Sequence, residues 1–236
     1  MAECIKRGFV PSDIKDFSPK SIETLKRASD DVLAIIDRGY PIKSVSTFVG
    51  NHYQLSERQR LAIARAVSPT KDINIRLNKL KSSCENGVVY IDGLNIIITL
   101  ETMLSKTTLI KCMDGTIRDL CGLRGTYRLI DKTDTAINLI GKELSNLKIS
   151  KAIFYLDSPV SNTGKLSQRI YELLSNFPFE VETQLVPNAD VILENKENVI
   201  TSDAIILNKC ISWINLAYKI LDDFLKDTSI INFLNE

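Results

Sequence analysis

Three aspartates in this chain each follow a short apolar run, and carboxylates in such positions can bind a divalent cation or hold a proton. They are Asp92 in VVYIDGLN, Asp157 in AIFYLDSP and Asp203 in NVITSDAI. Since an α/β sheet gathers the carboxyl ends of its parallel strands along one edge, we expect these side chains to converge. The alternative is structural, because aspartate is favoured at turns and helix N-caps.

The other reactive residue types exclude several kinds of site. His52, expected in a turn, is the only histidine in the chain. Zinc sites with several histidines are therefore excluded, and a Ser-His or Cys-His pair would have to use this one ring. Neither CxxC spacing nor partner histidines accompany the five cysteines, so we expect reduced thiols: Cys4, Cys84, Cys112, Cys121 and Cys210. Any catalysis by this chain therefore depends on carboxylates.

The composition is typical of a globular protein that stays in solution. Hydrophobic residues make up 44% of the 236 residues and charged residues 25%. No apolar run approaches the ~18 residues that a membrane span requires, and the first residues lack the apolar region of a secretory signal. We therefore predict a cytoplasmic protein without a membrane segment.

Charge divides the chain into two parts. Residues 1–80 contain 14 lysines and arginines against 9 acids, whereas residues 81–236 have an acidic excess. Most of the basic excess lies between Arg58 and Lys81. Three interpretations remain open for this stretch: a helix face in solvent, a positive surface that docks the acidic part, or contact with nucleic-acid phosphates.

The residue pattern of the basic part predicts that it folds as a small helical domain. Ser18, followed by proline, is typical of a helix start, and Gly39 is expected to lie beyond the end of that helix. A second helix is expected from Ile42 to Val49, and Ser56 with Gln59 has the spacing of a capping box that opens a third. These last two helices also allow a helix-turn-helix that reads DNA, although any three-helix bundle gives the same pattern.

From about Val88, short apolar runs alternate with amphipathic segments, which is typical of βαβ units and a Rossmann-like, largely parallel sheet flanked by helices. Asp114 and Gly115 predict a two-residue hairpin turn. Further strands are expected at Lys151–Leu156 and Val181–Val186. Further helices are expected from Thr133 to about Leu147 and from near Gly164. A last helical region is expected from Ile205 to Leu225, with Trp213 in the core.

Two polar segments could bind an anion. The loop after the hairpin interleaves glycines with arginines and suits a phosphate or a base, or forms a plain surface. The helix that starts near Gly164 has free N–H groups, with Asn162 as a candidate cap and Lys165 beside them. A P-loop is excluded, because Leu166 stands where that motif needs serine or threonine.

The order of these segments resembles the PIN and NYN group of metal-dependent nucleases. DGLN, a strand that ends in LD, NADVIL and ITSDAII follow one another between Val88 and Leu207, in the order of that group's motifs. The layout also resembles an uncharacterised prokaryotic family that joins a helical domain to a PIN-like domain. The resemblance implies a helical domain at residues 1–80 and a PIN/NYN-like α/β domain at residues 81–236.

Carried onto this chain, the resemblance implies a site that binds Mg²⁺ or Mn²⁺ and hydrolyses RNA. Its catalytic carboxylates would be Asp92, Asp190 and Asp203, with Asp157 as a further metal ligand and with Asn95 and Ser202 in support. Converging carboxylates cannot all stay ionised without a cation, and such a cation can turn a bound water into a nucleophile. Substrate phosphates would be bound by Arg118, Arg124, Arg128, Lys165 and Asn162.

Three functions remain open from the sequence. The first is a metal-dependent ribonuclease. The second is a non-catalytic RNA-binding module, because Ala204 and Ile205 follow Asp203 at positions where such nucleases often carry another acid. These nucleases also commonly place an acid on the helix after the first strand, and only Glu101 is available there. The third is a DNA-binding regulator that acts through the helical domain. RNA is the expected partner, DNA the second, and a homodimer is left open.

Overall fold

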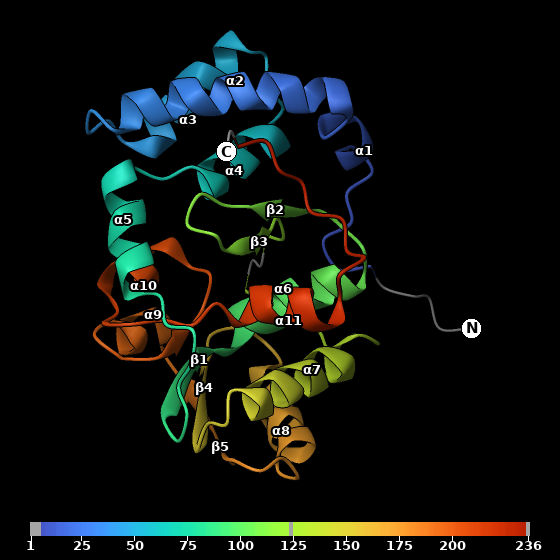
Figure 1. Cartoon of the computed structure of the whole chain (residues 1–236). Helices are drawn as coiled ribbons and strands as arrows, with labels where there is room; N and C mark the ends of the chain where they lie inside the picture. The colour runs from blue at the N-terminus through green and yellow to red at the C-terminus, as the bar shows by residue number, and fades with distance from the viewer. Residues whose placement is uncertain (1–5, 123–124, 235–236) are drawn as a thin grey trace.

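The computed structural model describes residues 6–122 and 125–234, and a helical part packs against an α/β part (Figure 1). The helical part consists of α1 (Asp13–Asp16), α2 (Pro19–Ile36), α3 (Ile42–His52), α4 (Glu57–Ala66) and α5 (Thr70–Lys79). Ser18 caps α2, and the capping box of Ser56 and Gln59 opens α4, so both predicted starts are confirmed. His52 is the exposed last residue of α3 and does not lie in the turn.

Four parallel strands form the central sheet in the order β5-β4-β1-β6. They are β1 (Val88–Asp92), β4 (Lys151–Asp157), β5 (Glu180–Val186) and β6 (Val199–Ile200). The helices between and after them are α6 (Gly93–Leu104), α7 (Thr133–Asn146), α8 (Thr163–Leu174), α9 (Ala189–Leu193), α10 (Ala204–Lys209) and α11 (Leu216–Phe224). The prediction of a parallel sheet flanked by helices is therefore confirmed.

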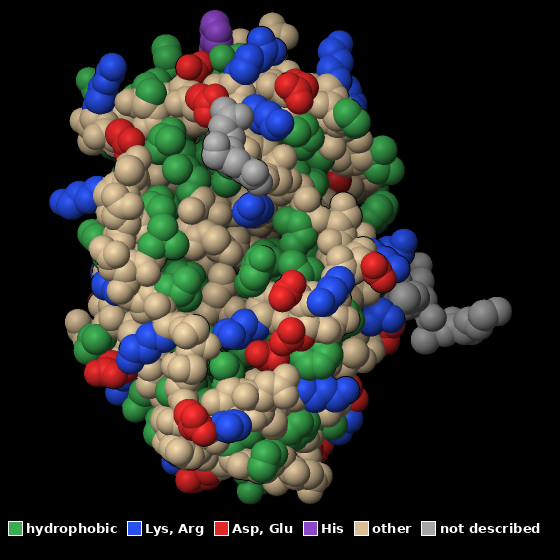
Figure 2. Space-filling view, in the orientation of Figure 1, with side chains coloured by type: hydrophobic (Ala, Val, Ile, Leu, Met, Phe, Trp, Pro, Cys, Tyr) green, Lys and Arg blue, Asp and Glu red, His purple; other side chains and the backbone are tan. Residues whose placement is uncertain are grey.

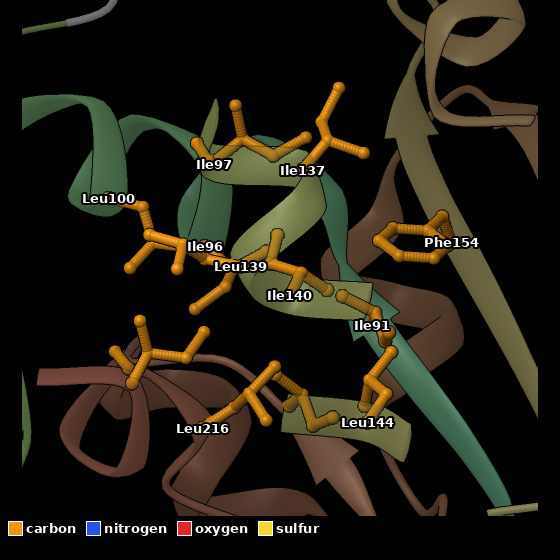
Figure 3. Close-up of a cluster of buried hydrophobic side chains, with 14 of the residues drawn as sticks. Ile91, Ile96, Ile97, Leu100, Ile137, Leu139, Ile140, Leu144, Phe154 and Leu216 are labelled. Atoms are coloured by element: carbon orange, nitrogen blue, oxygen red, sulfur yellow. The ribbon is translucent and has the colours of Figure 1, made fainter. Parts of the chain in front are cut away.

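Helices cover both faces of this sheet because its strands are apolar on both sides. On one face, Ile91 and Phe154 pack against residues of α6, α7 and α11 (Figure 3). The other face packs Tyr155 and Val199 against α9, α10 and Trp213. Fully burying one such side chain contributes about 1.5 to 3 kcal/mol, so these two layers fix the sheet and the ends of its strands.

The order in which strands are added to the sheet reverses at β1, although all four strands run in the same direction. The chain moves outward from β1 to β4 and β5, then returns to the opposite side of β1 to form β6. The carboxyl ends of two strands at such a switch point are separated by a crevice, where ligands of open α/β sheets usually bind.

A hairpin of β2 (Leu109–Lys111) and β3 (Ile117–Asp119) joins the two parts of the molecule. Cys112 N donates to Thr116 O, so the loop has three residues and the predicted two-residue turn is wrong. Gly115 takes the left-handed conformation, with φ 78°, which a three-residue loop needs at this point. Ile110, Leu120 and Phe233 pack into the core of the helical part, so that core extends beyond residue 80.

The last apolar segment, expected to be a helical region from Ile205 to Leu225, forms two helices with an extended stretch between them, so the prediction holds at both ends and is wrong in the middle. Between α10 and α11 the chain is extended, and Trp213 N donates to Lys79 O while Ile214 N donates to Val199 O. The segment thus lies between the end of α5 and β6 as a short additional bridge. Trp213 is 0% exposed, as predicted for a core residue. No helix in the described ranges is long and apolar enough to cross a membrane.

Candidate active site

A cleft of about 630 Å³ lies at the carboxyl ends of the strands, at the switch point beside β1 and β6. All four aspartates singled out from the sequence line it: Asp92, Asp157, Asp190 and Asp203. They come from the ends of β1 and β4, from the first turn of α9, and from the residue before α10. The predicted convergence is therefore present in the fold.

Asp92 is the most enclosed of the four, with 7% exposure. It caps α6, because one carboxylate oxygen accepts from Asn95 N at 3.3 Å, and the other accepts from Thr201 Oγ1 at 2.9 Å. Burial, with additional repulsion from Asp190 and Asp203, raises its pKa to about 7 although both hydrogen bonds favour the ionised form. At neutral pH this carboxyl group can therefore exist with or without its proton.

Asp157 and Asp203 combine a structural contact with a free oxygen. Asp203 Oδ1 caps α10 by accepting from Ile205 N at 2.7 Å and from Ile206 N at 3.2 Å. Asp157 Oδ1 accepts from Ala189 N at 2.8 Å. Among the described residues, neither second oxygen has a hydrogen-bond partner. Capping thus orients these side chains and leaves one oxygen of each for a ligand.

Asp190 lies at the rim of the cleft and is exposed. Within residues 6–122 and 125–234, its carboxylate has neither a hydrogen bond nor an ion pair. Partial desolvation, followed by repulsion from Asp203 and Asp157, raises its pKa. A carboxylate without partners beside other carboxylates is the group that most needs a cation or a proton.

Asn95 and Ser202 support the site as expected, and Thr201 is an unexpected third support. Asn95 Oδ1 accepts from both Ser202 N and Ser202 Oγ at 2.9 Å, which ties α6 to the loop after β6. Thr201 Oγ1 accepts from Asp203 N at 3.0 Å while it donates to Asp92. The Thr201 hydroxyl therefore couples the two aspartates that flank the switch point.

The donor chemistry fits a hard divalent cation, because the available ligands are carboxylate oxygens. Across the two described ranges, however, no group of three or more aspartates, glutamates, histidines or cysteines is arranged to hold a metal ion. Glu101, the acid on the helix after the first strand (α6), does not line the cleft. It is buried and forms an ion pair with Arg7 at 2.8 Å. The cleft thus has suitable oxygens but no closed metal cage.

Unlike the four aspartates, the predicted substrate-binding residues are not gathered in the cleft with free polar groups. Arg118 lines the cleft, but each of its three nitrogens already donates inside the protein, to Ser202 O, Arg65 O and Asp114. Arg128 and Lys165 are exposed residues that do not line the cleft. Arg124 lies outside the described residues.

Asn162, the candidate cap of α8, does not cap that helix. It has φ 64°, and its side chain donates to Tyr127 O at 2.7 Å. This left-handed position suits asparagine, because its short amide can bond locally to the backbone. Asn162 therefore fixes the loop before α8, and the structure gives it no contact with the cleft.

Several residues that line the cleft were not predicted from the sequence as site residues, and two of them are charged. Asp119, at the end of β3, accepts from Thr99 Oγ1 at 3.2 Å and from Cys121 N at 2.7 Å. Arg65 of α4 lies 3.5 Å from the Asp119 carboxylate. The apolar and small residues missed are Ile42, Ala64, Leu94, Ile98, Cys121 and Val160. Only the basic character of the stretch after Arg58 gave any signal for Arg65.

The basic stretch serves mainly to join the two parts of the molecule. Arg76 pairs with Asp114 at 2.8 Å, Lys79 donates to Asn208 O at 2.7 Å, and Lys81 lies 3.4 Å from Glu197. On the face seen in Figure 2, lysines and arginines are interspersed with acids over both parts. These contacts support the docking interpretation of the three left open by the sequence.

Comparisons with known proteins identify the two parts of the chain but assign no activity. Residues 81–219 match the domain of unknown function DUF5616, and residues 24–79 match the protein family of unknown function DUF434. An uncharacterised protein of Methanocaldococcus jannaschii is 37% identical over 186 residues, which cover 78% of this chain and 89% of that protein. No solved structure gave a significant match.

Proposed function

The chain belongs to the DUF5616 family, and we propose that the aspartate cleft of its α/β part is the active site of a divalent-cation-dependent, PIN/NYN-like nuclease that hydrolyses RNA. One observation carries the proposal. Four aspartates from separate elements line one cleft at the switch point of a parallel sheet, and their mutual repulsion helps to raise the pKa of two of them. A purely structural role for each aspartate would not require them to meet.

The proposed ligands are Asp92, Asp190 and Asp203, with Asp157 beside them. A bound Mg²⁺ or Mn²⁺ would neutralise the carboxylates and favour attack of water on a phosphodiester. The oxygens of Asp157 and Asp203 that do not cap a backbone N–H are held in position for such a ligand. Asp190, whose exposed carboxylate has no hydrogen bond or ion pair among the described residues, is the ligand that can turn toward such a cation without any change in the fold.

Cleavage of a labelled single-stranded RNA in Mn²⁺ and in EDTA tests the proposal. We expect cleavage by the wild type in Mn²⁺, none in EDTA, and a rate lower by on the order of 100-fold or more for Asp190→Asn. Asp222→Asn, at an exposed aspartate of α11, is the matched control and should retain the wild-type rate. Equal rates in wild type and Asp190→Asn would refute the assignment.

A second candidate function is RNA binding without turnover. It is favoured by the lack of a closed three-carboxylate group in the described chain and by Ala204 and Ile205 after the last aspartate. This alternative predicts RNA affinity that falls steeply with salt and no cleavage with any divalent ion. A DNA reader in α4 has less support, because Arg58 is bonded to Asp13, and Arg60 to Asn51 and to the carbonyl of residue 55.

A further inference from the structure

We propose that the helical part supplies the substrate-contacting wall of the aspartate cleft, where Arg65 binds a phosphate and Ile42 and Ala64 contact a base. This inference rests on the proposed function, since it takes a nucleic-acid strand as the occupant of the cleft. It gives the helical part a role within the active site, in contrast to independent DNA reading.

The cleft is formed by both parts of the molecule. Ile42 begins α3, and Ala64 and Arg65 lie in the last two turns of α4, yet all three line the same space as the strand-end aspartates. In Figure 1, α3 and α4 lie on the side of the hairpin away from the sheet, and the hairpin connects the two parts. Removal of the helical part would therefore leave the aspartates with an open edge in place of a cleft.

Apolar side chains surround the carboxylates of this cleft. Apart from the four aspartates, most of the lining residues are apolar or small: Ile42, Ala64, Leu94, Ile98, Cys121, Val160, Ala204 and Ile205. Ile205 is 58% exposed, although it lies directly beside the acids in the first turn of α10. Apolar side chains next to a charged site offer a surface for the flat, weakly polar face of a base.

Arg65 is the cation of this wall that can still bind a ligand. Its side chain is 32% exposed, against 9% for Arg118. Two terminal nitrogens of Arg65 donate to Asp119 O and Cys121 O, and its Nε donates to no described residue. The Asp119 carboxylate lies 3.5 Å from this guanidinium without a hydrogen bond to it. A guanidinium has five N–H donors, so three of Arg65 make no hydrogen bond to a described residue and can bond to a phosphate.

The same contacts that occupy Arg65 also hold it still. The carbonyls of residues 119 and 121 belong to β3 and the strand's continuation, which anchor the guanidinium against the hairpin. An acidic cleft repels phosphate, so a fixed cation on the opposite wall gives the strand a second point of attachment besides any bound metal ion. Arg65 is thus a substrate-binding residue on α4.

Binding of a fluorescein-labelled single-stranded RNA, measured by anisotropy in Ca²⁺, tests this wall. Ala64→Tyr fills the space beside Arg65 without removing an ion pair, and Arg65→Met removes the charge at similar length. We expect either change to weaken RNA binding by about tenfold or more. Ala34→Tyr, at an exposed alanine of α2 outside the cleft, is the matched control and should bind RNA like the wild type.

Mn²⁺ binding by calorimetry and RNA cleavage separate the two proposals. If the wild type cleaves RNA while Ala64→Tyr keeps wild-type RNA affinity, the wall is refuted and the proposed function stands. If the wild type neither binds nor cleaves RNA, the proposed function fails and the wall fails with it. Unchanged Mn²⁺ affinity in Ala64→Tyr, together with weakened RNA binding, supports a substrate contact; loss of both would instead indicate a damaged metal site and overturn it.

Discussion

Replacing Asp92 by asparagine should stabilise the metal-free protein at neutral and alkaline pH. Burial and the neighbouring aspartates raise the pKa of Asp92 from 3.8 to about 7. A shift of one unit corresponds to 1.36 kcal/mol, so keeping this carboxylate ionised in the fold costs about 4 kcal/mol at pH 8. Asparagine removes the charge, but its single carbonyl oxygen can accept only one of the two hydrogen bonds that Asn95 N and Thr201 Oγ1 donate to Asp92, and the loss of the other costs about 1 kcal/mol. The expected net gain is about 3 kcal/mol.

The pH dependence of this gain follows from the sign of the shift. Because the folded pKa lies above the unfolded one, the penalty is complete above pH 7 and disappears as the pH falls toward 4, where both states are protonated. Asp92→Asn should therefore be more stable than the wild type by about 3 kcal/mol at pH 8 and by about 1 kcal/mol at pH 5.

Urea unfolding in EDTA at these two pH values measures the difference, with Asp222→Asn as an exposed control that should change little. If the stability difference between wild type and Asp92→Asn is the same at pH 5 and pH 8, the pKa of Asp92 is not raised in the folded protein. Addition of Mn²⁺ should stabilise the wild type more than Asp92→Asn, since binding to the folded state alone raises stability.

Three further changes test other parts of the structure. Arg118→Met should destabilise the protein by about 1 to 3 kcal/mol, because the carbonyls of Ser202 and Arg65 lose their donor while Asp114 keeps its ion pair with Arg76. Urea unfolding checks this, and exposed Arg128→Met should cost less than about 0.5 kcal/mol. Trp213→Phe should cost about 1 to 3 kcal/mol, since Trp213 Nε1 donates to Arg76 O at 2.7 Å, and an unchanged thermal midpoint would contradict that bond. Asp190→Asn should lower the pKa of Asp92 by removing one repelling charge, and a wild-type pH profile of stability in this variant would rule the coupling out.

Features that depend on local chemistry were the easiest to predict from the sequence. The capping box of α4, the strand ends and the helix after Asp92 each rest on a few neighbouring residues whose preferences agree. The convergence of the aspartates followed from one topological rule, because parallel strands place their carboxyl ends together. Asp190 needed the resemblance to a nuclease motif, since it begins a short helix and ends no strand.

The remaining parts of the cleft depend on contacts between distant segments. Arg65 faces the aspartates only because the hairpin docks into the core of the helical part, which no local pattern predicts. Arg118 looked like a phosphate ligand in the sequence, yet docking buries it against Asp114 and Ser202. Trp213 interrupts a helical pattern because its segment bonds to Lys79 and Val199. Tertiary pairing of this kind overrides local propensity.

A crystal soaked in Mn²⁺ shows whether the aspartate cleft binds a divalent cation. We expect an anomalous-scattering peak in the cleft about 2.1 Å from carboxylate oxygens of Asp92, Asp190 or Asp203, and no such peak for Asp190→Asn. A cleft without a peak at saturating Mn²⁺ would contradict cation binding there, and a peak that persists unchanged in Asp190→Asn would contradict the role of Asp190 as a ligand.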